Sequence, residues 1–256
     1  MDSLIEAKVI NMVSRFCSVV PNWKQGSDII IEMLYKTADD KIKSRLLLKL
    51  KRMSADNRFV VDGSLSDDLK EIYSTSDNEV KDSILDLIFY TNDDTIISSF
   101  RPIMSTALAE GGCGYLRATA LRCFFKFSKK NSETITKICQ QTSVDMDFNV
   151  RRAGIKCIRQ LAEDRNSSFL DSLQIEEKII FSNETILKFS RPELKSPAAL
   201  IKLLSFDDDW EVKDKLDQVM IKLLVIAYYV ITTLILYHQW FHLNNFIIER
   251  SSRYYY

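Results

Sequence analysis

The sequence predicts an all-α solenoid of antiparallel helix pairs, and three observations support this prediction. Five short windows recur in which a polar start and two spacers precede an aliphatic anchor and then a base. The first four anchors are separated by 38, 36 and 34 residues and the last follows after 62; they are Ile42, Val80, Leu116, Val150 and Val212. Strand-like alternation is absent, and only 6 Gly and 4 Pro are present. A recurring period near 35 residues is typical of stacked helical hairpins.

Each window has the composition of a helix start. Four of the five begin with Asp (Asp39, Asp77, Asp147 and Asp209), and Cys113 is the exception. An Asp at this position accepts hydrogen bonds from free backbone N–H groups and complements the positive end of the helix dipole. The base that follows each anchor is Lys43, Lys81, Arg117, Arg151 or Lys213. We expect Arg117 and Arg151 to form a ladder, each binding an acid of the next unit.

An apolar stripe continues from each anchor. The residues four positions after each anchor are Leu46, Ile84, Ala120, Gly154 and Leu216. Those five positions after it are Leu47, Leu85, Leu121, Ile155 and Asp217. Those eight positions after it are Leu50, Ile88, Phe124, Ile158 and Met220. This spacing predicts amphipathic helices with one buried face. The small residues Ala120 and Gly154 predict close approach of a neighbouring helix. Asp217 places a charge where the stripe requires an apolar side chain.

The expected elements follow in order along the chain. An amphipathic helix over 4–20 ends before Pro21. Helix pairs then follow at 28–36 with 40–52, 65–73 with 79–90, 94–110 with 115–129, 132–141 with 149–163, and 198–205 with a helix from Trp210. Residues 59–63 are expected to form a loop and Pro102 to kink its helix. Residues 168–189 contain no anchor-and-base window and predict a degenerate repeat of two short helices.

The repeated windows resemble the HEAT/armadillo-type helical repeat family. Asp147-Phe148-Asn149-Val150-Arg151-Arg152-Ala153-Gly154 is similar to the D-x-x-V-R-x-x-A pattern of a HEAT second helix, and the resemblance extends over about residues 28–222. It implies a superhelix whose second helices line a concave inner face that binds protein partners. The stretch Asp209-Trp210-Glu211-Val212-Lys213 is similar to one in HEAT scaffolds of the DNA-damage response that associate with the ATM kinase.

The composition changes after Lys222, so we divide the chain into a repeat domain over residues 1–222 and an apolar tail over residues 223–256. Leu223 to Ile248 contains no charged residue, but only its first 15 residues are continuously apolar, whereas a membrane span takes about 20. Three interpretations stay open: a buried or capping helix of the solenoid, a membrane anchor over Leu223–Leu243, or a tail that is not native to the fold.

Residues with catalytic chemistry are scarce. Lys+Arg 35 balances Asp+Glu 35, which argues against dedicated nucleic-acid binding. No phosphate-binding glycine loop is present, and His238 and His242, the chain's 2 histidines, lie in the tail. We therefore expect no enzyme, no cofactor and no metal site. Cys123 and Cys157 fall inside the repeats and are expected to be buried, and the N-terminus lacks the apolar segment of a secretory signal.

One basic strip on the fourth predicted second helix is the candidate binding site. Arg152, Lys156 and Arg159 are spaced three to four residues apart, which places them on one helix face. Together with Arg122 on the preceding second helix, they are expected to be exposed in front of the buried Val150, Ile155 and Ile158. The expected partner is an acidic or helical protein segment. The expected location is the cytoplasm, the nucleus or both, or alternatively a membrane to which the tail anchors the chain.

Overall fold

The structure is a computed structural model that describes residues 8, 11, 12, 15, 23–109, 113–173 and 191–252, and within this part of the chain the regular secondary structure is entirely helical. This confirms the all-α prediction. The expected helix over 4–20 lies largely outside the described residues. The same holds for most of the degenerate repeat, of which α10 (Ser167–Ser172) is described.

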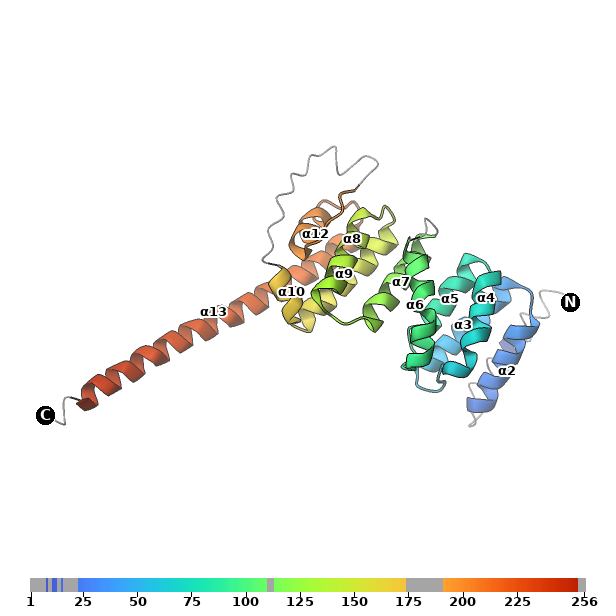
Figure 1. Cartoon of the computed structure of the whole chain (residues 1–256), viewed down its shortest axis with the longest axis horizontal. Coiled ribbons are helices and arrows are strands. Elements are labelled where there is room, and N and C mark those ends of the chain that lie inside the picture. The colour runs from blue at the N-terminus through green and yellow to red at the C-terminus, as the bar shows by residue number, and fades with distance from the viewer. Residues whose placement is uncertain are drawn as a thin grey trace.

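The helices follow one another in two rows (Figure 1). One row holds the first helix of each pair: α2 (Trp23–Lys36), α4 (Ser66–Thr75), α6 (Asp94–Ala109), α8 (Ser132–Val144) and α12 (Pro197–Leu204). The other row holds the second helices: α3 (Asp40–Ala55), α5 (Asn78–Ile88), α7 (Gly114–Phe127), α9 (Phe148–Glu163) and α13 (Trp210–Ser252). Each second helix packs on its own first helix and on the next second helix along the chain. A 3₁₀ turn, η1 (Gly63–Leu65), precedes α4.

The predicted caps form as the residue types require. Asp39 accepts a hydrogen bond from the backbone N–H of Lys41, Asp77 from those of Glu79 and Val80, and Asp147 from that of Asn149. Asp209 accepts from the N–H of Val212 at 2.9 Å. Cys113 makes no side-chain cap at the start of α7. The four aspartates therefore fix where their helices begin, and each lies between the first and the second helix of its own pair.

The apolar stripes form one continuous core. All five anchors are buried, and the side chains five residues on (Leu47, Leu85, Leu121 and Ile155) are fully excluded from solvent. Cys123 and Cys157 are buried as expected, and burial raises the pKa of each thiol to about 12. Gly154 faces Thr142 of α8 so closely that an added Cβ would lie 1.9 Å from the Thr142 hydroxyl. This confirms that a small residue here allows close helix packing.

The last repeat departs from the predicted stripe. Asp217 is exposed and so does not place a charge in the core, and Met220 is 41 % exposed. Val212 and Leu216 are buried as predicted, and Val219 is the buried apolar residue in place of Met220. The stripe therefore shifts by one residue along α13, because this helix contacts α9 on one side and α12 on the other. Pro102, where a kink is predicted, lies inside α6, which continues through it from Asp94 to Ala109.

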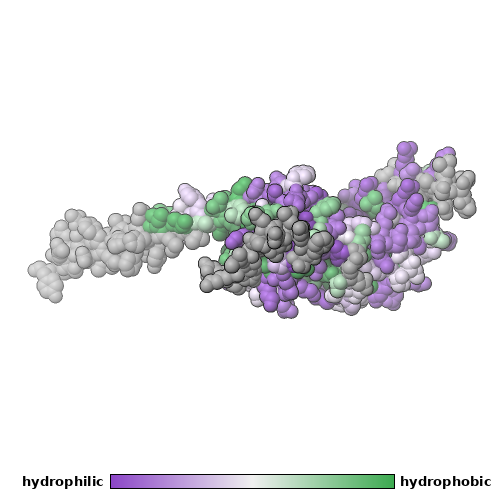
Figure 2. Space-filling model, turned by 90° about the horizontal axis from the view of Figure 1, so that it is seen from above, coloured by the Kyte–Doolittle hydropathy of each residue, from purple (hydrophilic) through white to green (hydrophobic). Residues whose placement is uncertain are grey.

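The distal part of α13 projects beyond the two rows of helices (Figure 1). Leu224, Tyr228 and Leu236 are each about two-thirds exposed, and apolar side chains colour the start of the projecting arm (Figure 2). The described side chains at the start of this arm are therefore not buried against the two rows of helices. Among the described residues, one helix segment, Trp210–Thr233, is long enough and apolar enough to cross a membrane. Its mean hydropathy is 1.5, and 12 % of its most apolar stretch is buried.

Candidate partner-binding face

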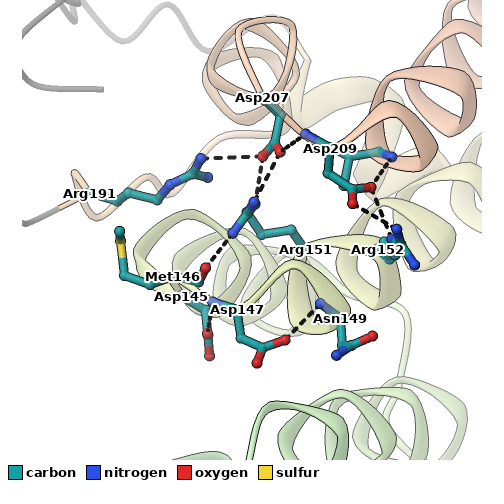
Figure 3. A network of polar contacts seen from close by, with 10 residues as sticks. Asp145, Met146, Asp147, Asn149, Arg151, Arg152, Arg191, Asp207 and Asp209 are labelled. Atoms are coloured by element: carbon teal, nitrogen blue, oxygen red, sulfur yellow. Dashed lines mark hydrogen bonds and ion pairs between the residues drawn. The ribbon is translucent and has the colours of Figure 1, made fainter. Parts of the chain in front are cut away.

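A buried ion-pair network joins α9 to the start of α13. The Arg151 guanidinium donates to both carboxylate oxygens of Asp207, with Nε–Oδ2 at 2.5 Å and Nη2–Oδ1 at 3.0 Å, and its Nη1 donates to the Met146 carbonyl at 2.6 Å. Arg191 reaches the same carboxylate at 3.2 Å (Figure 3). Asp207 is fully buried. The adjacent Asp208 is exposed.

The arginines determine the charge state of this buried acid. Burial alone would raise the pKa of Asp207, but the hydrogen bonds from Arg151 and from the Asp209 backbone N–H, with the charges of Arg151 and Arg191, outweigh burial and lower it. Burial and the neighbouring Arg151 lower the pKa of Arg191. A carboxylate bound by two guanidiniums stays ionised, and removal of either partner leaves an uncompensated buried charge.

The same contact occurs one repeat earlier. Arg117 of α7 binds Asp145 through two parallel hydrogen bonds of 2.8 Å and 2.9 Å. Asp145 and Asp207 each stand two residues before a capping aspartate, Asp147 or Asp209, whose backbone N–H they also accept. The predicted ladder, in which Arg117 and Arg151 each bind an acid of the next unit, is confirmed at both positions. The ladder is therefore structural.

Arg152 is a ladder member as well, which corrects the prediction that it is a free surface base. Its guanidinium donates to both carboxylate oxygens of Asp209 at 2.9 Å and 2.7 Å, and its Nη1 lies 2.7 Å from a carboxylate oxygen of Glu211. It also lies over the Phe148 ring at 4.6 Å. The hydrogen bond to Asp209 raises the pKa of Arg152. Neither Asp209 nor Glu211 could be assigned to Arg152 from the spacing within α9.

Arg159 and Arg122 are half-buried where the sequence predicted exposed bases. Arg159 donates to Glu163 on its own helix at 3.1 Å and also to Gln218 of α13. Arg122 makes a long contact of 3.4 Å with Asp86 of α5 and stacks on the Phe89 ring at 4.8 Å. The residues behind the predicted strip, Val150, Ile155 and Ile158, are fully buried as expected. The predicted strip is thus in the predicted place, but most of its charge is balanced by neighbouring helices.

Lys156 is the member of the predicted strip that stays exposed. It makes no hydrogen bond or ion pair with a described residue. Partial burial lowers its pKa, and the positive charges of Lys215, Arg122 and Arg152 lower it further, while the carboxylate of Glu211 acts in the opposite direction. These neighbours belong to α13, α7 and α9. Lys156 is therefore an exposed base of α9 whose charged form burial and the neighbouring bases disfavour.

A carboxylate that the sequence analysis missed lies on the same row of helices. Asp82 of α5 has one oxygen, Oδ1, that is buried without a hydrogen-bond partner. Burial raises the pKa of Asp82 to about 6 and the charge of Asp86 adds to the rise, against a hydrogen bond from Thr119 and the charges of Lys51 and Arg122. The signal in the sequence is a pair of aspartates four residues apart, which share one helix face.

Comparison with known proteins adds no assignment: no family model matches the chain, and no curated protein matches it either. Within the described residues, no group of three His, Cys, Asp or Glu side chains is placed to hold a metal ion. The chemistry that the site itself offers is electrostatic. It presents one exposed base, Lys156, beside bases that neighbouring carboxylates already bind.

Proposed function

We propose that the chain is a non-enzymatic scaffold of the HEAT/armadillo type that binds a protein partner on the face formed by its second helices. The observation that supports this most is Lys156, an exposed base on α9, which is the second helix that packs on both α7 and α13. In a solenoid of helix pairs the second helices form a continuous surface, and such surfaces suit extended or helical partner segments. The packing of each second helix on the next one along the chain fits this arrangement.

The similarity of the Asp209-to-Lys213 window to DNA-damage scaffolds leads us to keep a nuclear kinase, or another component of that response, as a proposed partner. Most of this window has a role inside the chain: Asp209 and Glu211 bind Arg152, and Val212 is buried. Trp210 is 74 % exposed and is the side chain of the window that a partner could reach most directly. Nuclear and cytoplasmic location follows from this proposal.

A charge-reversal experiment tests the scaffold proposal. A photo-crosslinking amino acid at Gln160, an exposed position on α9, is expected to capture a partner in cells. The double variant Arg122→Glu with Lys156→Glu should abolish the adduct. The matched control reverses two exposed bases of the other row, Arg101 on α6 and Lys137 on α8, and should keep it. Equal adducts from both double variants would contradict binding on the second-helix face.

A second candidate function is a membrane-tethered adaptor. The observation that favours it is the exposure of an uncharged helix: Leu224, Tyr228, Ile231, Ile235 and Leu236 are all more than half exposed. Leu223 to Ile248 supplies 26 residues without a charge, and about 20 residues span the hydrocarbon core. A helix that is apolar all round and has no protein around it suits lipid. The anchored part would begin after Lys222, because the earlier part of α13 carries charges and packs on α9.

Carbonate extraction tests the membrane proposal. The full chain should stay in the membrane pellet, and the double variant Ile231→Lys with Ile235→Lys should be extracted, since a lysine at the centre of a span costs about 2.5 to 3.5 kcal/mol. A chain that ends at Lys222 should behave like the double variant. Extraction of the full chain by carbonate would contradict the anchor while leaving the scaffold proposal intact.

A further inference from the structure

A cleft lies where the ends of two first helices meet the starts of two second helices. Its walls come from the last turn of α4, the first turn of α5, the second half of α6 and the first turn of α7. Its volume is about 360 Å³, which is at the lower end of the range for ligand sites. A site of this size suits one or two side chains of a partner rather than a large cofactor.

The lining of the cleft combines apolar side chains with bases and contains no Asp or Glu. Tyr73, Pro102, Ile103 and Leu116 supply the larger apolar groups. Pro102 is exposed and Ile103 is half-buried, so part of this apolar surface still faces solvent. Covering it with an apolar side chain would remove that surface from water, which is the dominant favourable term in most protein association.

Lys81 supplies a positive charge that the cleft does not balance. Its ammonium lies 5.6 Å from the centre of the Tyr73 ring and makes no hydrogen bond or ion pair with a described residue. An aromatic face attracts an ammonium but does not neutralise its charge. Arg117, the other base of the lining, already binds Asp145 through two hydrogen bonds. The cleft therefore lacks one anionic group, and its place is beside Lys81.

Cys113 accounts for the missing acid. It stands where the other four repeated windows carry a capping aspartate, and it lines the cleft. An aspartate there would bring a carboxylate to the lining, which the cysteine does not. Among the cysteines of the described residues, Cys113 is the one that is not buried, so its thiol can also report on whether the cleft is filled.

We propose that this cleft binds a partner segment in which a large apolar residue adjoins an Asp or Glu. The apolar side chain enters against Ile103 and Leu116, and the adjoining carboxylate accepts a hydrogen bond from the Lys81 ammonium. A lysine is a compact charge on a flexible stem, which suits a single carboxylate oxygen. The inference goes beyond the scaffold function proposed above, because the cleft is lined by both rows of helices and its lining does not include Lys156.

Binding of three capped peptides to the full chain tests the chemistry of the cleft. The probe is acetyl-Ala-Phe-Glu-Ala-amide, and the two blanks replace its Phe by Ala or its Glu by Gln. Loss of the Phe should weaken binding by about tenfold or more, because a large apolar side chain is no longer buried. Loss of the Glu should weaken it by about fivefold, as for one charge-assisted contact. In Lys81→Gln the Glu and Gln peptides should bind equally.

Two tryptophan variants of α6 locate the binding. Thr106 lines the cleft, and the equally exposed Ser105 beside it does not. Thr106→Trp should fill the cleft and abolish binding of the probe, whereas the matched control Ser105→Trp should keep it. A saturating probe should also slow the alkylation of Cys113 by iodoacetamide, measured by mass spectrometry, in the wild-type chain and in Ser105→Trp.

Four results would overturn the inference. They are no binding of the probe at millimolar concentration, a preference for Glu that persists in Lys81→Gln, equal binding to the two tryptophan variants, and alkylation of Cys113 that the bound probe does not slow. Crosslinking at Gln160 reports on the second-helix face and not on the cleft. If it still depends on Arg122 and Lys156 when the cleft fails these tests, the scaffold proposal stands.

Discussion

The junction between α3 and α5 and the junction between α9 and α13 begin with the same sequence pattern and are held by different chemistry. At the first, the base Lys43 turns back to Asp40 of its own helix at 2.9 Å and to the Ser76 hydroxyl at 3.2 Å, while Ser44 bonds Glu79 at 3.0 Å. At the second, Arg151 binds the buried Asp207 through two hydrogen bonds. The residue two before the cap makes the difference: it is Thr75 in one case and Asp207 in the other.

The partner of the base after the anchor therefore depends on which residue stands two positions before the next capping aspartate. The base binds a buried acid of the next unit where an acid stands two residues before the next cap, and a partly buried acid of its own helix where that acid is missing. The junction between α3 and α5, which we call the serine junction after Ser44, consists of part-buried hydrogen bonds that contribute about 0.5 to 1.5 kcal/mol each. The arginine junction carries buried charges that are costly to separate. The two ends of the repeat array should therefore respond very differently to loss of the equivalent contact.

The largest expected effect comes from breaking the arginine junction. Asp207→Ala leaves Arg151 and Arg191 buried with an uncompensated charge and should lower the free energy of unfolding by about 3 to 5 kcal/mol. The equivalent change at the serine junction, Lys43→Ala, should cost less than about 1 kcal/mol because its ion pair is partly exposed. Urea unfolding of both variants measures the contrast. Similar losses at the two junctions would contradict the comparison.

The helix contact that Gly154 permits gives the next largest effect. In Gly154→Ala the new methyl group overlaps the Thr142 side chain of α8, and overpacking of this kind costs about 1 to 3 kcal/mol. Gly63→Ala is the matched control, because its Cβ would meet Thr95 at 3.4 Å, close to ordinary contact. Thermal melts should show a clear loss for the first variant and little change for the second. Equal melting temperatures would show that α8 yields easily.

Asp82 of α5, next to the serine junction in the chain, is a carboxylate whose charged form is disfavoured in the folded state. Its folded pKa of about 6 lies above the ordinary value near 3.8, so the folded state holds the proton more tightly than the unfolded state. Wild-type stability should therefore fall as pH rises from about 4 to 6 through this residue. Asp82→Asn should be more stable than wild type at pH 7 by up to about 2 kcal/mol, and this gain should vanish toward pH 4.

Chemical denaturation across that pH range measures the effect of Asp82. Asp86→Asn is the control, because it removes a carboxylate that Lys51 and Arg122 bind, and it should bring no gain at pH 7. A gain for Asp82→Asn that persists unchanged at pH 4 would assign the effect to packing rather than to charge.

The smallest effect distinguishes the two kinds of base on α9. Lys156→Glu should change the free energy of unfolding by less than about 0.5 kcal/mol, as most surface changes do. Arg152→Glu should cost more, because it sets a carboxylate against Asp209 and Glu211. The melting temperatures of the two variants, measured by circular dichroism, show whether the two bases differ in their contribution to stability. An unchanged Arg152→Glu melt would restore that residue to the set of free binding bases.

The sequence carried much of the fold because the relevant information is local. The capping aspartates and the buried stripe depend on residues within two helical turns, and both were predicted. The partners of the bases were harder to predict because they depend on distant residues. Arg152 meets Asp209 across 57 positions, so spacing within α9 could place Arg152 on a face but could not show that the face was occupied. Asp217 misled for a related reason, since the orientation of α13 is fixed by α9 and α12.

Continuity of α13 has a mechanical consequence. This helix runs for 43 residues from Trp210 to Ser252 and contains no glycine or proline, so it is about 65 Å long at 1.5 Å per residue. Its first turns hold Glu211 against Arg152 and Lys215, and its distal turns extend away from the two rows of helices. Because no glycine or proline interrupts it, the helix is expected to move as one rigid rod. A twist or pull on its far end is therefore transmitted to the contacts of Glu211 with Arg152 and Lys215.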